Sequence, residues 1–549
     1  MRIPSFTQRS GKMTIRSNFV LLIAIPLLLS AFTHLWNPIG FPSVHTDEGH
    51  YMLRVTHVLE GLGPQEPKNI YTKPYDHPYF GQIFLAAVLG TIGYPHALNP
   101  IPGDLQSIQM LYTFPRAFMG LLAVADTFLL YKIVQRRYDR KVAFVAAIIF
   151  AVMPVTWLLR RILLDNLLLP FLLSSIFFAI CVKKPIQSTG SCNGKNIDDQ
   201  NKYDYTANNF LLAVSSGIFV GLAISTKIPA FTFIPLIALL IFINSNKNLK
   251  LLGLWFIPVI LLPLIWPTYA ALSGGFQEWK ENIIWQATER FAVPLSDAIR
   301  NFHIIDPALL VLSISGLFFS ALKRDMFLLV WVIPYLIFIN SVGHVAYWHF
   351  VPVLPAFCIA AARLIFSLIR RISMRINITE DKLYLFIVCG TGLFGLTMSI
   401  LLVSTNVTSG YFETIAFIVR YVPENAETKD TDPDTKGVTV IGGRWVPGFS
   451  WIPTYVFDRD VDFRKFYIST ESITPKKLFI VDPDFSRFIS SNKNEDVVKQ
   501  IRAAYDSTDL VFEINQNPYT FDLQNYPYSV MKIVRTQTMN TPLEIRSNY

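Results

Sequence analysis

The chain has 549 residues, of which 52% are hydrophobic and only 16% are charged. This composition argues against a set of ordinary soluble domains and predicts a polytopic helical membrane protein. The formal net charge of +9 is spread over many loops instead of one patch, which argues against nucleic-acid binding. None of the four cysteines lies beyond residue 389, so no disulfide framework is expected in the C-terminal region.

The first apolar segment, residues 18–36, is long enough at about 1.5 Å per residue to cross a hydrocarbon core of about 30 Å. Basic residues precede it, as they do in a signal peptide. The segment is too long for a signal peptide and lacks a small-residue cleavage site. We therefore expect an uncleaved first span, with its N-terminus in the cytoplasm, in a protein of the cell membrane.

Residues 79–94 are also apolar enough to span, but the distribution of basic residues argues against it. Counting them as a span would place the basic cluster at residues 135–141 outside the membrane, whereas basic residues gather in short cytoplasmic loops. We therefore expect residues 37–115 to form one external loop with two amphipathic or re-entrant helices at the membrane interface.

The remaining apolar segments then alternate without conflict, and every basic cluster falls on the cytoplasmic side. With residues 18–36, the expected spans number about eleven, the others being residues 117–134, 142–159, 166–182, 209–226, 228–244, 251–272, 307–321, 326–340, 349–369 and 383–403. Beyond them, short β-rich runs such as residues 437–441 and 477–481 alternate with helical stretches. We expect a transmembrane domain at residues 1–403 and a small extracytoplasmic α/β domain at residues 404–549.

Adjacent carboxylates, Asp47 and Glu48, begin an amphipathic helix in the external loop. A structural alternative makes Thr46 or Asp47 the helix N-cap and Glu48 a first-turn acid that suits the helix dipole. Their place at the membrane face, where other isolated polar residues converge, favours a chemical role, because charge in hydrocarbon is costly.

The other polar residues lie on the same predicted side of the membrane and are His77, Arg161 with Asp165, Lys227, Arg290 and His349. Taken singly, each has an ordinary structural explanation: a turn, a local ion pair, a snorkelling lysine, a solvated loop arginine and an aromatic anchor.

Taken together, these features resemble the GT-C superfamily of lipid-dependent glycosyltransferases, in particular the protein O-mannosyltransferases and the aminoarabinose transferases that modify lipid A. The resemblance covers roughly residues 18–370. Its parts, in order, are Asp47-Glu48, Asp76-His77-Pro78, Arg116, Arg161 and Asp165 in RRILLDNLLLPF, GLAISTK ending at Lys227, Glu289-Arg290-Phe291 and the prolines of HFVPVLP after Trp348. Two features differ: Tyr79 and Phe80 follow Pro78, where the family usually has two prolines and a leucine, and the Trp-Trp-Asp motif of the oligosaccharyltransferase catalytic subunit is absent.

The resemblance implies an inverting transferase that moves a sugar from polyprenyl or dolichyl phosphate to a hydroxyl of a protein, glycan or lipid. Asp47 would be the general base, and Glu48 would orient a substrate. Arg290, with His77 and Lys227, would hold the donor phosphate. The supporting residues would be Asp165, Arg161, Arg116 and His349.

No cofactor is implied, although His45, Asp47, Glu48, His50 and His77 could supply mixed ligands to a divalent metal. Two other classes of protein stay open at this point, a polytopic transporter and a non-catalytic receptor or scaffold. The predicted threading also places the sequon at Asn406 outside the cell and the sequon at Asn377 inside.

Overall fold

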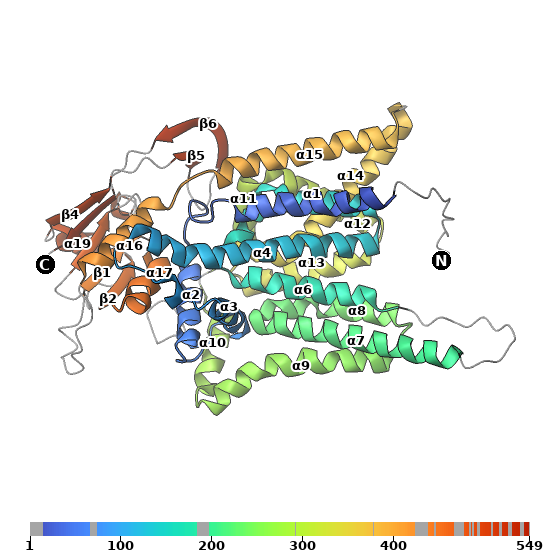
Figure 1. Ribbon diagram of the computed structural model, residues 1–549, viewed down its shortest axis with the longest axis horizontal. Coiled ribbons are helices and arrows are strands. Elements are labelled where there is room, and N and C mark those ends of the chain that lie inside the picture. The colour runs from blue at the N-terminus through green and yellow to red at the C-terminus, as the bar shows by residue number, and fades with distance from the viewer. Residues whose placement is uncertain are drawn as a thin grey trace.

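A bundle of long helices forms most of the computed structural model, and a small sheet lies at one end of the bundle (Figure 1). The structure describes residues 15–65, 74–183, 197–290, 292–376, 378–422, 438–443, 446–465, 477–481, 485, 488–490, 495–506, 509–514, 519–524, 530–538 and 543–547.

The helices up to the C-terminal region are α1 (Ile15–Leu35), α2 (Thr46–Leu59), α3 (Phe80–Thr91), α4 (Leu105–Arg137), α5 (Arg140–Val152), α6 (Leu164–Cys181), α7 (Ile197–Thr226), α8 (Ile234–Asn244), α9 (Leu249–Leu272), α10 (Phe276–Thr288), α11 (Leu295–Ile305), α12 (Pro307–Leu322), α13 (Met326–Val342), α14 (Leu354–Ile376), α15 (Glu380–Val403) and α16 (Ser409–Tyr421). Short 3₁₀ helices are η1 (His96–Leu98), η2 (Pro154–Arg160), η3 (Ile228–Phe233) and η4 (Tyr347–Val353).

The prediction of a polytopic helical membrane protein is confirmed. Six helices in the described residues are long and apolar enough to cross a membrane, and the bent pair of α5 and η2 makes a seventh candidate. Four shorter apolar helices, Leu21–Leu35, Ile228–Asn244, Pro307–Leu322 and Met326–Val342, fall below that length. Since a 17-residue helix extends only about 26 Å, it is shorter than a typical hydrocarbon core.

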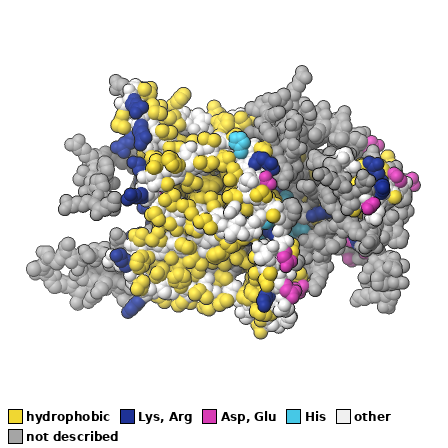
Figure 2. Space-filling model, turned by 180° about the vertical axis from the view of Figure 1, so that it is seen from behind, with side chains coloured by type: hydrophobic (Ala, Val, Ile, Leu, Met, Phe, Trp, Pro, Cys, Tyr) yellow, Lys and Arg dark blue, Asp and Glu magenta, His cyan; other side chains and the backbone are white. Residues whose placement is uncertain are grey.

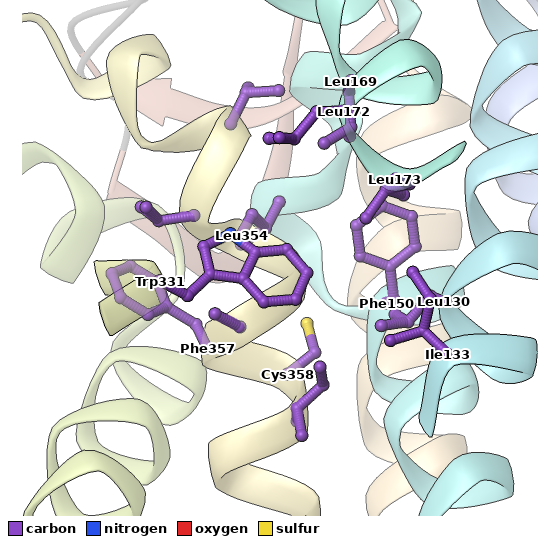
Figure 3. Close-up of a cluster of buried hydrophobic side chains, with 14 of the residues drawn as sticks. Leu130, Ile133, Phe150, Leu169, Leu172, Leu173, Trp331, Leu354, Phe357 and Cys358 are labelled. Atoms are coloured by element: carbon purple, nitrogen blue, oxygen red, sulfur yellow. The ribbon is translucent and has the colours of Figure 1, made fainter. Parts of the chain in front are cut away.

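Hydrophobic side chains cover the middle of the bundle, and lysine and arginine gather at the end nearest the N-terminus (Figure 2). Inside the bundle, the core joins α13 and α14 to α4, α5 and α6. The residues labelled in Figure 3 that form this contact are Trp331, Leu354, Phe357, Cys358, Leu130, Ile133, Phe150, Leu169, Leu172 and Leu173.

Close helix contacts explain part of the GLAISTK motif. On Gly221 of α7, a Cβ atom would lie 2.7 Å from the carbonyl oxygen of Pro258 in α9, and Gly217 is similarly crowded by Trp255. Small residues at such positions let two helix backbones approach closely. Gly221 therefore serves packing, and only Lys227 at the end of the motif reaches the polar site described below.

Helix α4 contains the predicted second span, residues 117–134, but begins earlier, at Leu105. The Asp104 carboxylate caps this start by accepting the Ser107 N–H at 2.8 Å. At about 1.5 Å per residue, its 33 residues extend about 50 Å, well beyond one membrane crossing. The extra turns carry Tyr112 and Arg116 toward the C-terminal region. The two helices predicted earlier in this loop are present as α2 and α3, and α2 runs across the direction of the long helices (Figure 1).

The C-terminal region contains α17 (Val446–Phe449), the π-helical turn η6 (Ile452–Val456), α19 (Glu495–Asp506) and the strands β1 (Val438–Gly442), β2 (Val461–Lys465), β3 (Lys477–Val481), β4 (Asp509–Ile514), β5 (Tyr519–Gln524), β6 (Val530–Thr538) and β7 (Leu543–Ser547). Five strands form a sheet in the order β2-β1-β3-β7-β4. Strand β1 pairs in parallel with β2 and β3, whereas β7 is antiparallel to β3 and β4; β5 and β6 form a separate antiparallel pair.

One side of this sheet shares a hydrophobic core with the membrane-proximal helices. Val440 of β1 belongs to the same buried cluster as Met52 of α2, Ile108 of α4 and Phe412 of α16. The C-terminal region is therefore packed onto the loop that carries the acidic pair.

The sequon at Asn406 is engaged in the fold. The Asn406 side chain accepts the Ser409 N–H at 3.2 Å at the start of α16, and the buried Thr408 hydroxyl donates to the Ile39 carbonyl. The second predicted sequon begins at residue 377, which lies outside the described residues.

A buried acidic residue joins three helices at the end of the bundle remote from the sheet. The side chain of Asp325 is 5% exposed and accepts the Tyr138 hydroxyl at 2.7 Å. It also pairs with the Arg363 guanidinium and lies 3.8 Å from that of Arg137. The carboxylate thus holds the start of α13 against the end of α4 and the middle of α14.

We expect Asp325→Ala to destabilise the protein by about 3 kcal/mol or more, because it leaves Arg363 without its buried counter-ion. Thermal unfolding of the purified protein in detergent would measure the change. Asp381→Ala is the matched control, since Asp381 pairs with Lys141 at 2.6 Å but is 84% exposed, and exposed pairs contribute little. Equal midpoint temperatures of unfolding for the two variants would contradict a stabilising role for the buried Asp325 carboxylate.

Candidate active site

The acidic pair stands in the first turn of α2, and His45 caps that turn. The His45 ring Nδ1 accepts the Asp47 N–H at 3.2 Å, while Glu48 Oε2 accepts the His45 N–H at 2.8 Å. This is a reciprocal capping arrangement. The alternative in which Thr46 or Asp47 caps the helix is therefore wrong, and the Asp47 carboxylate is not consumed by capping.

Glu48 is fully buried and is held by Arg116 of α4. The Arg116 Nε and Nη2 atoms donate to Oε1 and Oε2 at 3.0 and 2.8 Å, and Nη1 donates to the carbonyls of Pro38 and Pro42. Glu48 Oε1 also accepts the Ile162 N–H at 3.2 Å. Burial alone would raise the pKa of Glu48, but the Arg116 charge and hydrogen bonds bring it below its usual value. Glu48 is thus an ionised anchor for the start of α2.

The Asp47 side chain does not take part in the buried Glu48–Arg116 pair. Its side chain is 35% exposed, and its Oδ1 lies 3.7 Å from His45 Nδ1. Burial opposes ionisation, yet the charges of His45, His50, Arg290 and Lys227 bring the pKa of Asp47 below its usual value. The last two residues are far away in the sequence, so the fold brings separate cationic groups around this carboxylate.

His77 reaches α2 through the residue before it. The buried Arg54 of α2 forms an ion pair with Asp76, with 2.8 Å between Nη1 and Oδ1, and the His77 ring centroid lies 6.5 Å from that of Tyr51, also on α2. Burial lowers the pKa of His77 to about 4, despite the nearby Asp76 carboxylate. His77 is therefore neutral at neutral pH and acts as a hydrogen-bonding group, not as a fixed cation.

Lys227 is paired with Asp165 deep in the protein. Its Nζ lies 2.6 Å from Asp165 Oδ2, and both side chains are nearly inaccessible. The expected local pairing of Asp165 with Arg161 is wrong, because the first turn of α6 faces the break between α7 and η3, where Lys227 lies. Arg161 instead donates to the Ser43 carbonyl at 3.3 Å and lies over the Trp157 ring.

Arg290 follows the C-terminus of α10 and is half-buried. Its Nη1 donates to Gln286 Oε1 at 3.0 Å, one turn earlier. Shortly after it, Val293 forms a parallel bridge with the chain at residues 343–345, with N–H to O distances of 2.9 Å. This bridge brings the Arg290 segment beside the loop that carries His349.

His349 in η4 accepts the Ala346 N–H at its Nδ1, at 3.2 Å. A neutral His349 ring therefore carries its proton at Nε2. The neighbouring Trp348 ring packs edge-on against the His45 ring, with 4.9 Å between centroids. The 343–349 loop thus lies between the Arg290 segment and the start of α2.

The predicted residues separate into two groups. Asp47, His77, Lys227, Arg290 and His349 converge, since the charges of Lys227 and Arg290 act on the other three. Among the described residues, no three histidine, cysteine or acidic side chains are grouped to hold a metal ion.

The second group holds the elements in place and consists of Glu48, Arg116, Arg161 and Asp165. Sequence reasoning missed Arg54, which joins α2 to the His77 turn. The sequence feature that could have identified Arg54 is a charged residue on the apolar face of an amphipathic helix.

Residues 69–271 match the family model of the dolichyl-phosphate-mannose-protein mannosyltransferases. This match covers less than half of the chain and marks the protein as a membrane glycosyltransferase similar to that family. The transporter and scaffold alternatives are therefore set aside. No curated protein matches the chain in sequence.

The fold of this glycosyltransferase is similar to that of ArnT from Cupriavidus metallidurans. The apo structure of ArnT has a TM-score of 0.52 at 10% identity, covering 98% of this chain and 99% of ArnT. The structure of ArnT bound to undecaprenyl phosphate has a TM-score of 0.51 at the same identity and coverage. The apo oligosaccharyltransferase of Archaeoglobus fulgidus has a TM-score of 0.48 at 15% identity, covering 90% of this chain and 69% of that one.

We expect the two neighbouring carboxylates to differ sharply in their effect on stability. Glu48→Gln should destabilise the glycosyltransferase by about 3 kcal/mol or more, because Arg116 loses a buried counter-ion. Asp47→Asn should change stability by no more than about 0.5 kcal/mol, because its side chain is partly exposed. Thermal unfolding of both variants at pH 7 would measure this.

The pH dependence gives a further check on the same pair. Since the pKa of Glu48 is lower in the folded state, its ionised form contributes stability above the usual value of 4.5, and that contribution is lost as the pH falls through the folded pKa. The difference in stability between wild type and Glu48→Gln should therefore disappear at acid pH. A difference that does not change with pH, or a larger loss of stability in Asp47→Asn, would contradict the role of Glu48 as the buried partner of Arg116.

Proposed function

We propose that this glycosyltransferase transfers a sugar from a polyprenyl or dolichyl monophosphate to a hydroxyl of a protein, glycan or lipid, with inversion at the anomeric carbon. One observation carries the proposal: a partly exposed carboxylate, Asp47, lies within the electrostatic reach of Arg290 and Lys227, which come from separate elements. The matching family is named for dolichyl-phosphate-mannose, and ArnT, of similar fold, was solved with undecaprenyl phosphate.

Asp47 is the general base of the proposed reaction. The lowered pKa of Asp47 keeps the carboxylate ionised at neutral pH. The carboxylate oxygens do not cap the helix, and the side chain is partly exposed. As the acceptor oxygen bonds to the anomeric carbon, the bond between that carbon and the phosphate oxygen breaks. The hydroxyl proton passes to Asp47, and the bonding electrons leave with the phosphate.

Arg290 and Lys227 stabilise the charge that develops on the leaving phosphate. Arg290 donates one described hydrogen bond, to Gln286, and its planar fork suits two phosphate oxygens. Lys227 has three N–H groups, so it can bind Asp165 and a phosphate together. Neutral His77 and His349 add hydrogen bonds, and a bound phosphate would favour the protonation of His77.

Glu48, Arg116, Asp165 and Arg161 act indirectly. Glu48 and Arg116 fix the start of α2, Asp165 fixes the Lys227 ammonium, and Arg161 fixes the backbone before His45. The orienting role expected for Glu48 is therefore exerted on Asp47, its neighbour, instead of on a substrate.

For the membrane arrangement, we propose about eleven spans: the seven candidates and the four shorter apolar helices, which coincide with the segments expected from the sequence. The N-terminus and the lysine- and arginine-rich end are cytoplasmic. The active site and residues 404–549, as an extracytoplasmic domain beyond the transmembrane domain 1–403, lie on the external side, with α2 and α3 at the interface.

The direct test is sugar transfer from a radiolabelled polyprenyl-phosphate sugar by the purified protein in detergent, with a crude membrane extract as acceptor. We expect Asp47→Asn to lower kcat by about 10² or more, the usual contribution of a general base. Asp297→Asn is the matched control, a carboxylate 40% exposed in α11. Unchanged turnover in Asp47→Asn would exclude Asp47 as the base, and absence of donor consumption by wild type would overturn the proposed reaction.

Arg290 should contribute to catalysis by binding the donor phosphate. We expect Arg290→Ala to lower kcat/KM for the donor by about 10²–10³, and Arg290→Lys to recover part of the loss, because lysine keeps the charge without the bidentate fork. Arg300→Ala in α11 removes an exposed arginine of the same region and should have no effect. Steady-state kinetics with varied donor concentration would measure this, and equal kcat/KM for Arg290→Ala and wild type would place the phosphate elsewhere.

A further inference from the structure

The C-terminal region touches the catalytic helix through two facing glycines. A Cβ atom on Gly49 of α2 would lie 2.5 Å from both the Cα and the carbonyl oxygen of Gly448 in α17. A Cβ atom on Gly448 would lie 2.9 Å from the His45 carbonyl oxygen. Real Cβ atoms do not approach other atoms so closely, so the two backbones are in direct contact. Figure 1 shows α17 beside α2, near the N-terminal end of α4.

Helix α4 fixes the α17 side of this contact. The Tyr112 hydroxyl donates to the Gly448 carbonyl, and the Trp451 indole N–H donates to the Tyr112 hydroxyl at 3.3 Å. The Phe412 and Phe449 rings pack on the Tyr112 ring at 5.7 and 5.3 Å. All of these side chains are buried, so the Gly448 backbone has little freedom to move.

The same helix fixes the other side of α2. Arg116 follows Tyr112 by one helical turn and holds Glu48. The first turn of α2 is therefore held at Glu48 through Arg116 and at Gly49 through Gly448. Asp47 directly precedes both anchors, and its own side chain is the partly exposed one.

We propose that residues 446–451 position the catalytic base, with Gly49, Gly448 and Tyr112 as positioning residues. This inference rests on the proposed role of Asp47. It gives the C-terminal region a part in the chemical step: the segment holds the carboxylate where the acceptor oxygen must deliver its proton. The donor-binding cations Arg290 and Lys227 belong to other elements, so the segment affects turnover more than donor binding.

The buried aromatic residues of this segment agree with that role. Phe449 and Trp451 could in principle stack on sugars, but both are fully buried in the core shared with α2, α4 and α16. Trp445, the remaining aromatic residue of the segment, lies outside the described residues.

The test compares Gly448→Ala and Tyr112→Phe with wild type, all as full-length proteins. Gly390→Ala in α15 is the matched control, because a Cβ there would meet no atom within 4 Å. Three quantities are measured: kcat, the KM for the polyprenyl-phosphate sugar, and the amount of this donor bound per protein at saturation. A displacement of about 1 Å at a catalytic group can cost about 10² in rate.

We expect Gly448→Ala to lower kcat about tenfold or more, with donor KM and bound donor per protein close to wild type. Tyr112→Phe should have a smaller effect in the same direction, and Gly390→Ala none. A merely structural role would lower bound donor in proportion to kcat, because part of the protein would be unfolded. Such a proportional loss, or an unchanged kcat, would overturn the proposal.

Hydrogen exchange at the backbone of residues 45–52 tests the contact without any turnover. It should rise in Gly448→Ala and stay at the wild-type level in Gly390→Ala; no rise would overturn the positioning role. Failure of wild type to consume the donor would instead count against the proposed function, so the two failures are distinguishable.

Discussion

The buried ion pair between Glu48 and Arg116 is the interaction on which the site depends. Two buried charges are tolerated only when their geometry and hydrogen bonding are nearly complete. Here the guanidinium meets both carboxylate oxygens and two backbone carbonyls, and the carboxylate accepts two further backbone N–H groups. Because so many partners must be in place together, the pair specifies one position for the start of α2 relative to α4. The direction of Asp47 follows from that position.

Two adjacent carboxylates thus acquire opposite roles through helix geometry alone. Successive side chains on a helix point about 100° apart, so when Glu48 faces the core, Asp47 faces the cationic groups. Capping by His45 completes the separation, because it satisfies the first-turn backbone without using the Asp47 carboxylate. In the proposed mechanism, a carboxylate therefore serves structure at Glu48 and chemistry at Asp47.

Sequence reasoning recovered what is encoded locally. Apolar length predicted the membrane helices, and helical spacing predicted α2. It could not pair Asp165 with Lys227, because they are 62 residues apart and meet only when α6 packs against the break after α7. For the same reason, Gly49 and Gly448 carry no local signal: each is an ordinary glycine until two distant backbones touch.

In the proposed mechanism, the Asp165–Lys227 pair holds a cationic side chain in place for the donor phosphate. Asp165 fixes the Lys227 ammonium through a single 2.6 Å contact. Because an ammonium has three donors, the pair can accept a second anion without giving up the first. A phosphate that arrives from the membrane would therefore meet a charge that is already fixed, and little reorganisation would be needed as negative charge grows on the leaving group.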